Sequence, residues 1–411
     1  MKKYLIRAGV VAVALAAGSA YATNGDNLEG IGAISEGAGG TGVAAPQDAL
    51  TAVVNNPAGL AFAPIPSNGA VNVGATLFQP QVDAKISTQM GTYAGGSDDP
   101  LSVIPFVGYG RPLSEALVFG FGAYGVSGLG TDYRGQGWDL DGNPANGYEG
   151  DVFTKFASLK VAPALSYKAA EDLSLGAALY GDYSTLDMGQ GESEAFGVGV
   201  QVGVVYRLGA VQLGASYSTP QKADFDEVYN FDAQTGDTKK DRLTLEQPAV
   251  YAVGASWQVT EALLLAIDVK QLAWASAEGY DAFDWEDQWV YAIGASYAAG
   301  EKLTLRAGFN YAENPVKEHN GWDPSGTTMV QGKEVNTMGY ELLRTVGFPA
   351  IVESHLTLGF SYQISAAMSL DAAYMHAFEE TISESSVGGA IGFESTLVED
   401  SVTLALAWSF E

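Results

Sequence analysis

Apolar and polar residues alternate along most of this chain, and past the first residues no stretch reaches the roughly 18 consecutive apolar residues of a transmembrane helix. In residues 302–311, apolar side chains fall at every second position from Leu303 to Tyr311, with Arg306 and Asn310 between them. A period of two indicates β-strands. The pattern predicts fourteen strands, at residues 69–80, 101–110, 115–127, 152–167, 172–186, 193–207, 210–218, 243–257, 262–274, 285–298, 302–312, 353–364, 367–379 and 397–410.

The connectors between these strands are short and long in turn. The short ones are RPLSE, KAAED, RLGA, QVTEA, AAGEK and QISAAM, and the long polar ones cover 81–100, 128–151, 219–242, 275–284, 313–352 and 380–396. The connector 187–192 is brief where a long one is expected. Hydrocarbon offers no hydrogen bonds to the backbone, so only helices and closed sheets can cross it. The alternating connectors are typical of an outer-membrane barrel and disfavour a soluble β-sandwich or propeller. We therefore expect an all-β fold, a transmembrane antiparallel β-barrel over residues 69–411.

The first 22 residues indicate export. Lys2, Lys3 and Arg7 precede an apolar run over 8–17, and Ala20-Tyr21-Ala22 is typical of a cleavage site. We interpret residues 1–22 as a cleaved signal peptide, because the apolar run is too short for the alternative, a membrane anchor. The net charge of −28 disfavours nucleic acid as a partner. The chain has no cysteine, so a large core or a closed sheet, rather than disulfides, must stabilise the exported protein.

Residues 23–68 do not alternate. They are small and rich in glycine and alanine, and PQDALTAVVN within them could form a short helix with Asp48 near its start. A simple porin would begin its first strand almost at once. We therefore expect residues 23–68 to form a hatch, meaning a plug inside the barrel lumen.

At this point the chain resembles a known family. The signal peptide, the stretch GAGGTGVAAPQDALTAVVNNPAGLA and the terminal LALAWSF are similar to the FadL/TodX family of outer-membrane transporters for long-chain fatty acids and other hydrophobic compounds. Asn56, Pro57 and Ala58 match the Asn-Pro-Ala of that family's hatch. The resemblance implies a fourteen-stranded barrel with an N-terminal hatch in the outer membrane of a Gram-negative cell. It also implies a lateral opening in the wall, where the third strand kinks inward.

The chemistry of the matched motif agrees with a pinned hatch. Pro57 fixes its own φ and favours an extended Asn56, whose buried amide must find partners. Ala58 and Gly59 allow the backbone to approach the wall closely. The alternative is an ordinary Asn-Pro turn.

Two further sets of residues are candidates for the path of a ligand. The third strand reads ALVFGFGAYGVSGLG, so a kink could lie at Gly120, Gly122 or Gly125, because glycine permits bulges. The family forms an outer apolar groove from its third and fourth outside loops, but here the third is only 187–192. We expect other loops to supply the groove, with Leu129, Tyr133, Trp138, Phe225, Phe231, Trp322 and Phe348 as its candidates.

Alternation directs several charged side chains into the lumen: Lys160, Asp182, Asp268, Lys270, Arg306 and Asp371. A charge facing lipid would cost roughly 2–4 kcal/mol at mid-membrane. The lysines and the arginine could meet a substrate carboxylate, but we favour pairing with the carboxylates and the hatch. The acidic loop clusters are interpreted as solvated rather than as calcium sites, and we predict no metal and no cofactor. The three histidines lie in separate elements and no G-x-S-x-G elbow is present, so no enzyme is expected.

These observations favour passive transport of hydrophobic molecules such as long-chain fatty acids, alkanes or aromatic hydrocarbons. Each buried methylene contributes about 0.8 kcal/mol, so a second state of the hatch must weaken the site for release. Two alternatives stay open, a narrow general porin for polar solutes and a structural or adhesive barrel. The expected partners are the hydrophobic substrate, outer-membrane lipid and lipopolysaccharide, and the barrel-assembly machinery, and the protein is expected to be a monomer.

Overall fold

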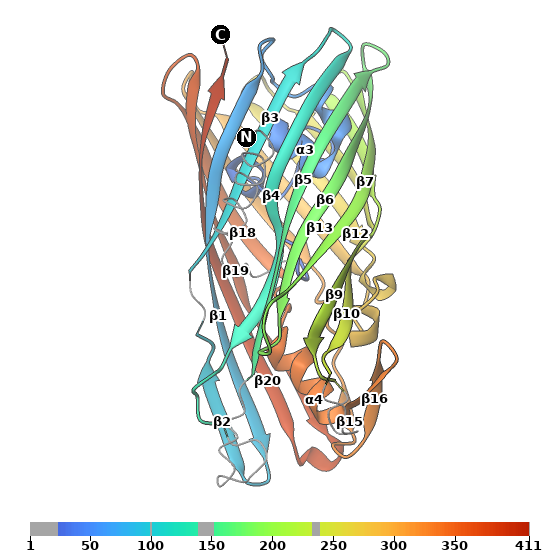
Figure 1. Ribbon diagram of the computed structural model, residues 1–411. Helices are drawn as coiled ribbons and strands as arrows, with labels where there is room; N and C mark the ends of the chain where they lie inside the picture. Colours follow the sequence, from blue (N-terminus) through green and yellow to red (C-terminus); the bar gives the residue numbers. More distant parts are fainter. Residues whose placement is uncertain (1–23, 99–100, 139–151, 232–238, 411) are drawn as a thin grey trace, which may run out of the picture.

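The structure, a computed structural model, describes residues 24–98, 101–138, 152–231 and 239–410. The signal-peptide prediction for residues 1–22 lies outside these ranges, as do residues 139–151. Within the described residues fourteen antiparallel strands form a barrel, which confirms the predicted fold class (Figure 1). The wall strands are β1 (Ala70–Thr88), β3 (Ser102–Pro112), β4 (Leu117–Asp132), β5 (Phe153–Lys168), β6 (Leu173–Asp187), β7 (Ser193–Leu208), β8 (Val211–Ser218), β11 (Val250–Gln258), β12 (Leu263–Leu272), β13 (Gln288–Ala298), β14 (Leu303–Ala312), β18 (Ser354–Gln363), β19 (Met368–Ser386) and β20 (Gly392–Ser409).

The last strand closes the ring. β20 pairs with its sequence neighbour β19 and also with β1, over a register that runs from Ala70↔Ser409 to Ser87↔Gly392. The barrel wall therefore has no open edge at the junction of its first and last strands. Such closure is what a sheet in hydrocarbon requires, because an unpaired edge would leave backbone groups without partners.

Side chains alternate between the two faces of the wall. On β14, Leu305 and Phe309 are exposed on the outside, whereas Arg306 and Asn310 are buried inside. The aromatic residues near the ends of the strands, including Trp257 and Trp408, also point outward. The outer surface is thus an apolar band with aromatic residues at its rim, as lipid contact requires.

The two ends of the barrel differ. At one end the strands are joined by short turns, and at the other, which contains α4, β15 and β16, the connections carry their own structure (Figure 1). Among the described residues, no helix combines the length and the apolar character needed to cross a membrane. The structured connections contain β2 (Gly91–Gly96), β9 (Gln221–Tyr229), β10 (Asp241–Gln247), η3 (Trp274–Ser276), η4 (Asp281–Phe283), β15 (Asn320–Trp322), β16 (Thr327–Val330), β17 (Lys333–Asn336), α4 (Thr337–Leu342), η5 (Leu343–Gly347) and η6 (Val387–Gly389).

Three boundary predictions are wrong. Residues 81–100 are not mainly a loop, because β1 continues to Thr88 and pairs there with β2 (Gly91–Gly96). Residues 243–257 are not one strand, because β10 pairs with β9 in a separate hairpin and β11 starts only at Val250. Pro248, which lies between them, has no N–H to continue a ladder. Residues 380–396 are not mainly a loop, because β19 and β20 extend through most of them. Most side chains of this segment are polar, and Ile382 and Phe393 are isolated apolar residues within it, so alternation gives only a weak signal there.

Residues 24–68 lie inside the barrel near its short-turn end (Figure 1). They contain α2 (Ala33–Glu36), α3 (Ala49–Asn55) and η1 (Pro57–Ala61). Asp48 caps α3 by accepting a hydrogen bond from the Thr51 amide at 2.7 Å. Leu50, Val53 and Leu60 are fully buried against inward-facing wall residues. We use the name hatch for residues 24–68 from here on.

Candidate functional site

The Asn-Pro-Ala segment is fixed to the inner wall by hydrogen bonds. Asn56 is extended, with φ −163° and ψ 104°, as the residue before a proline should be. Its Nδ2 donates to the carbonyls of Val43 at 2.8 Å, Val204 at 3.1 Å and Ala215 at 3.3 Å. Its Oδ1 accepts from the Ala58 amide at 3.1 Å. One fully buried side chain thus joins two parts of the hatch to β7 and β8.

Small polar residues of the wall hold the same segment, and the sequence analysis missed them. The hydroxyls of Ser166 and Ser174 donate to the Ala58 carbonyl at 2.9 and 2.6 Å. Ser216 donates to the Asn55 carbonyl at 2.8 Å, and Gln201 donates to the Val54 carbonyl at 3.1 Å. Their signal in the sequence is a polar residue at an inward position of a strand.

Two wall glycines allow the hatch to approach this closely. A Cβ at Gly176 of β6 would overlap the backbone of Pro57 and Ala58, and a Cβ at Gly203 of β7 would overlap the Asn56 side chain. Any larger residue at either position would displace the segment. Gly181, also on β6, faces outward and has open space around it.

Three of the predicted lumen charges hold the hatch. Asp268 accepts from the amides of Gly42 at 2.8 Å and Val43 at 3.0 Å. Lys270 donates to the Gly40 carbonyl at 3.2 Å and to the Asn55 side chain at 3.0 Å.

Arg306 donates to Gln47 of the hatch at 3.3 Å and to Ser361 of the wall at 2.7 Å. Lys160 and Asp182 instead pair with each other at 3.5 Å, and Asp371 is buried on the inner wall. These charged side chains therefore contact groups of the protein itself, and their role toward a substrate stays a prediction.

The third wall strand is irregular near the candidate glycines. β4 pairs with β3 only from Phe106↔Tyr124 to Pro112↔Val118, and its register against β5 shifts between Gly125 and Ser127. Beyond this bulge the hatch takes the place of β3, because the Leu28 amide donates to the Val126 carbonyl at 3.1 Å. Gly120 and Gly122 lie on β4 between its short-turn end and this bulge, and they face Val53 of the hatch. The role of these glycines in an opening stays a prediction.

An apolar pocket lies under the structured connections. Its free volume is only about 30 Å³, so any sizeable ligand must displace side chains. Seven of its nine lining residues were not among the sequence candidates: Phe156, Leu243, Leu245, Tyr280, Phe283, Trp285 and Arg344. The signal for the aromatic members among residues 280–285 was the stretch YDAFDW, which was passed over as a polar loop. The complete lining is Leu129, Phe156, Leu243, Leu245, Tyr280, Phe283, Trp285, Arg344 and Phe348.

The candidate groove residues do not come together. Leu129 and Phe348 line the pocket, Phe225 packs on Phe156 with 6.3 Å between ring centroids, and Phe231 packs against the same cluster. The other three belong to a separate cluster, in which Tyr133 stacks on Trp138 at 4.8 Å and Trp322 stacks on Phe393 at 5.4 Å. Most of these side chains are buried, so they do not form one open groove.

A polar cavity of about 130 Å³ lies on the hatch side of the lumen. Asn55 and Leu28 of the hatch line it, together with Lys160, Lys270 and Gln247 of the barrel. Apolar side chains such as Ile31 and Val126 also line it, so this cavity has a mixed wall that includes two lysines.

Asp26 of the hatch connects the linings of the two spaces. Its carboxylate, fully buried, accepts a hydrogen bond from the hydroxyl of Tyr280, which lines the apolar pocket. It also accepts from Nε2 of Gln247, which lines the polar cavity, at 3.3 Å. Ser127, at the bulge of β4, hydrogen-bonds the same carboxylate. Four separate segments therefore meet at one carboxylate between the pocket and the cavity.

A buried ionic cluster lies behind the apolar pocket. Arg344 has no exposed side-chain surface, and its Nη1 donates to Glu341 at 2.7 Å and to Glu384 at 3.1 Å. Its Nε donates to the Phe283 carbonyl at 2.7 Å and its Nη2 to the Lys317 carbonyl. The guanidinium that borders the pocket is therefore occupied by protein partners.

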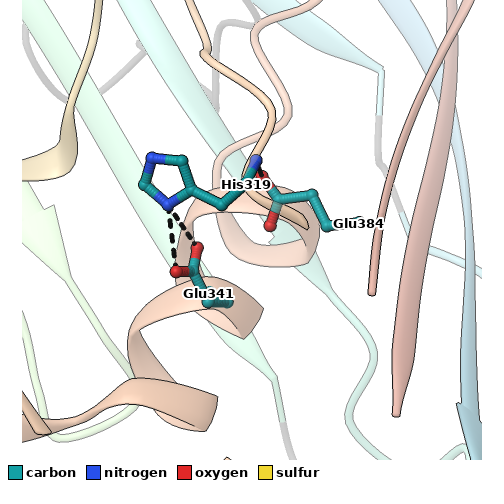
Figure 2. A group of neighbouring side chains, drawn as sticks. All are labelled: His319, Glu341 and Glu384. Atoms are coloured by element: carbon teal, nitrogen blue, oxygen red, sulfur yellow. Dashed lines mark hydrogen bonds and ion pairs between the residues drawn. The ribbon is translucent and has the colours of Figure 1, made fainter. Parts of the chain in front are cut away.

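His319 completes this cluster. Nδ1 of His319 lies 3.0 Å from Glu341, and Glu384 accepts from the His319 backbone amide at 2.9 Å (Figure 2). One histidine and two carboxylates so close together have the donor types of a metal site. The Arg344 guanidinium, however, already contacts both carboxylates and supplies the positive charge. We therefore treat the group as an ion-pair network.

Comparison with known proteins assigns the chain to a family. Residues 10–191 and 182–322 match the family described as outer membrane protein transport protein (OMPP1/FadL/TodX). Outer membrane protein P1 of Haemophilus influenzae is 25% identical over 198 residues, which are 44% of this chain and 38% of that protein. The match thus spans about two fifths of the length of the curated relatives.

Solved structures share the fold. The toluene transporter TodX of P. putida superposes with a TM-score of 0.68 at 21% identity, covering 93% of this chain and 99% of that one. A FadL homologue of Pseudomonas aeruginosa gives a TM-score of 0.67 at 17% identity, covering 94% and 100%. At these identities the likeness shows the architecture.

The close approach at Gly176 generates a prediction about the hatch. In Gly176→Ala the new methyl overlaps the Pro57–Ala58 backbone, so the hatch should lose about 1–3 kcal/mol of local stability. Amide hydrogen exchange of residues 55–61 should then accelerate about tenfold or more. Gly181→Ala, on the same strand but facing outward, should leave exchange unchanged. Equal exchange in the two variants would contradict the close approach.

Proposed function

The chain belongs to the OMPP1/FadL/TodX family of outer-membrane transport proteins, and on this premise we propose that it admits hydrophobic small molecules passively through a hatch-gated path. The family is one of transporters and not of enzymes, and the protein is located in the outer membrane. The candidate cargo comprises long-chain fatty acids, alkanes and aromatic hydrocarbons. Toluene is the cargo named for TodX of P. putida.

The apolar pocket is the observation that supports this proposal most directly. It is lined almost wholly by leucine and aromatic side chains, which gain roughly 25 cal/mol for each Å² of apolar surface removed from water. The one charged residue in its wall, Arg344, already donates to four protein groups. A carboxylate entering the pocket would find no unengaged cation there, so the pocket favours an uncharged molecule or the alkyl part of an acid.

The carboxylate of Asp26 supplies a gate beyond the pocket. The Tyr280 ring packs against both Trp274 and Trp285, at 4.6 and 4.8 Å between centroids, and its hydroxyl donates to Asp26. A molecule that moves from the apolar pocket toward the hatch must therefore displace this contact. Removal of one donor to a buried carboxylate costs about 1.5–3 kcal/mol, a cost that a bound apolar molecule can offset. The closed state is therefore stable and the open state is reachable.

The wall beside this gate suits a sideways exit. β3 and β4 separate beyond Tyr124, on the side of the structured connections. The hatch residues Asp26–Leu28 occupy the edge of β4 that β3 leaves unpaired there. Movement of this part of the hatch would expose a backbone edge toward the bilayer. A hydrophobic molecule would then reach lipid without crossing the polar cavity, where Lys160 and Lys270 would have to be desolvated against it.

Blocking the pocket tests the proposed route. Leu245→Trp places a larger ring in a space of about 30 Å³, so uptake of toluene and of laurate into proteoliposomes should fall about tenfold or more. Leu213→Trp, on the lipid-facing side of β8, is the matched control and should transport normally. Unchanged hydrophobic uptake in Leu245→Trp would remove the pocket from the path. Glucose uptake at a rate above that of toluene would favour a porin for polar solutes.

Loosening the gate gives a second test. Tyr280→Phe keeps the ring but removes the hydroxyl that donates to Asp26, so channel openings in planar bilayers should become about tenfold more frequent. Tyr340→Phe is the matched control, since that hydroxyl donates to the Ala282 carbonyl at 3.1 Å and does not touch Asp26. Equal opening frequencies in the two variants would exclude Asp26 as the gate.

A further inference from the structure

The ionic cluster behind the apolar pocket joins four segments that are distant in sequence. Asp284 follows η4, His319 lies before β15, Glu341 and Arg344 belong to α4 and η5, and Glu384 lies on β19. His319 is in contact with each of them through a side chain or its own amide. The cluster therefore holds the structured connections together at one point.

The same cluster forms one wall of the apolar pocket. Arg344 lines the pocket directly and donates to the carbonyl of Phe283, a second lining residue. Phe348, a third, directly follows η5, and its amide donates to the Leu343 carbonyl at 2.9 Å. Because the pocket has little free volume, a ligand can enter only if part of the lining moves, and this cluster holds three of the nine lining residues. The stability of the cluster thus bears on access to the pocket.

The charges inside the cluster balance when His319 carries a proton and both carboxylates are ionised; burial also raises the pKa of Glu384. Glu341 and Glu384 are two buried carboxylates, whereas Arg344 is one buried guanidinium. Asp284 and Lys317 are about half exposed and pair with each other at 3.4 Å. With a neutral imidazole the buried group keeps one negative charge without a partner, which costs several kcal/mol in a dry interior. With an imidazolium the two charges of each sign cancel.

The surroundings of the ring favour that proton. Nδ1 of His319 donates toward Glu341 and Nε2 lies 2.9 Å from Asp284, so both nitrogens face carboxylates. Tyr340 stacks on the ring at 6.3 Å, and Arg344 Nη1 approaches Nδ1 at 3.0 Å. The hydrogen bond with Glu341 raises the pKa of His319 above its usual value, although partial burial and the charge of Arg344 oppose it.

We propose that His319 is a positioning residue whose protonation closes the wall of the apolar pocket and whose deprotonation loosens it, which makes access of hydrophobic molecules dependent on external pH. The inference rests on the proposed function in so far as it concerns ligand access. A histidine whose pKa is raised on folding stabilises the closed wall fully below its unfolded pKa of about 6.5. This contribution is lost as pH rises through the higher folded value. Access should therefore be faster at mildly alkaline pH than at mildly acidic pH.

Opposite charge substitutions test this role in the full-length protein in detergent. His319→Gln retains a hydrogen-bond donor but no titratable charge, and should show the high-pH behaviour at every pH. His319→Lys keeps a positive charge across the range and should show the low-pH behaviour at every pH. The readout is the protection factor of amides 337–347 between pH 5.5 and 8.5, corrected for the intrinsic exchange rate. In the unmodified protein we expect protection to fall about tenfold for each unit by which the folded pKa exceeds the ordinary one.

The second readout is the rate at which N-phenyl-1-naphthylamine, which is uncharged over this range, enters the pocket. It should rise with pH in the unmodified protein and stay constant in both His319 variants. His376→Gln is the matched control, since His376 also lies 3.0 Å from a carboxylate, that of Asp400, but outside the cluster. This variant should keep the full pH response.

The outcomes separate the inference from the proposed function. If the probe does not bind, or binds equally to Leu245→Trp, the proposed pocket fails, while the exchange profile still decides the role of His319. If His319→Gln keeps the pH dependence of protection, or if the Gln and Lys variants shift it in the same direction, the inference is overturned.

Discussion

The demand of hydrocarbon that every backbone polar group be paired within the protein governs this structure. The wall answers it by closing β20 onto β1 along almost the whole length of both strands. The pairing is interrupted where β4 bulges between Gly125 and Ser127 and separates from β3. There the hatch supplies the missing partner, since Leu28 donates to Val126 and Gly128 donates to the Asp26 carbonyl. The weak point of the wall is thus also the point where the hatch is part of it.

A closed wall encloses a polar lumen, and the hatch that fills this lumen is held by hydrogen bonds as well as by apolar packing. Asn56 donates to three carbonyls, and the Ala58 carbonyl accepts from two wall serines. The lumen charges extend the same mode of attachment through Asp268, Lys270 and Arg306. Each of these bonds has water as an alternative partner when the hatch moves, so a bond between neutral groups contributes only about 0.5–1.5 kcal/mol net and a bond to a charged group about 1.5–3 kcal/mol. A segment held by many bonds of this size is well placed but displaceable.

At the end of the barrel that carries the structured connections, the main constraint is the balance of buried charges rather than backbone pairing. Its connections bury Glu341, Glu384 and Arg344 beside an apolar pocket, where an unbalanced charge is expensive. Tyr280 on the opposite side of the pocket binds a second buried carboxylate, that of Asp26, through neutral donors only. The pocket thus has a polar group on each side. We propose that the cluster around His319 responds to protonation, and that the Tyr280–Asp26 contact responds to movement of the Tyr280 hydroxyl.

The sequence by itself determined the barrel, its strand number and the inward direction of Lys160, Asp268 and Arg306, because a period of two assigns each residue to one face whatever its partners are. It also singled out Asn56-Pro57-Ala58, whose chemistry is local. It could not show that Tyr133, Trp138 and Trp322 form a cluster apart from Leu129 and Phe348, since loop residues have no period that places them. The tertiary structure was needed to show that the hatch contacts the wall at Gly176 and Gly203. It was needed equally to show that Asp26 contacts Tyr280 and that His319 contacts Glu341. These contacts join segments far apart in the chain, and their geometry exists only once the ring has closed around them.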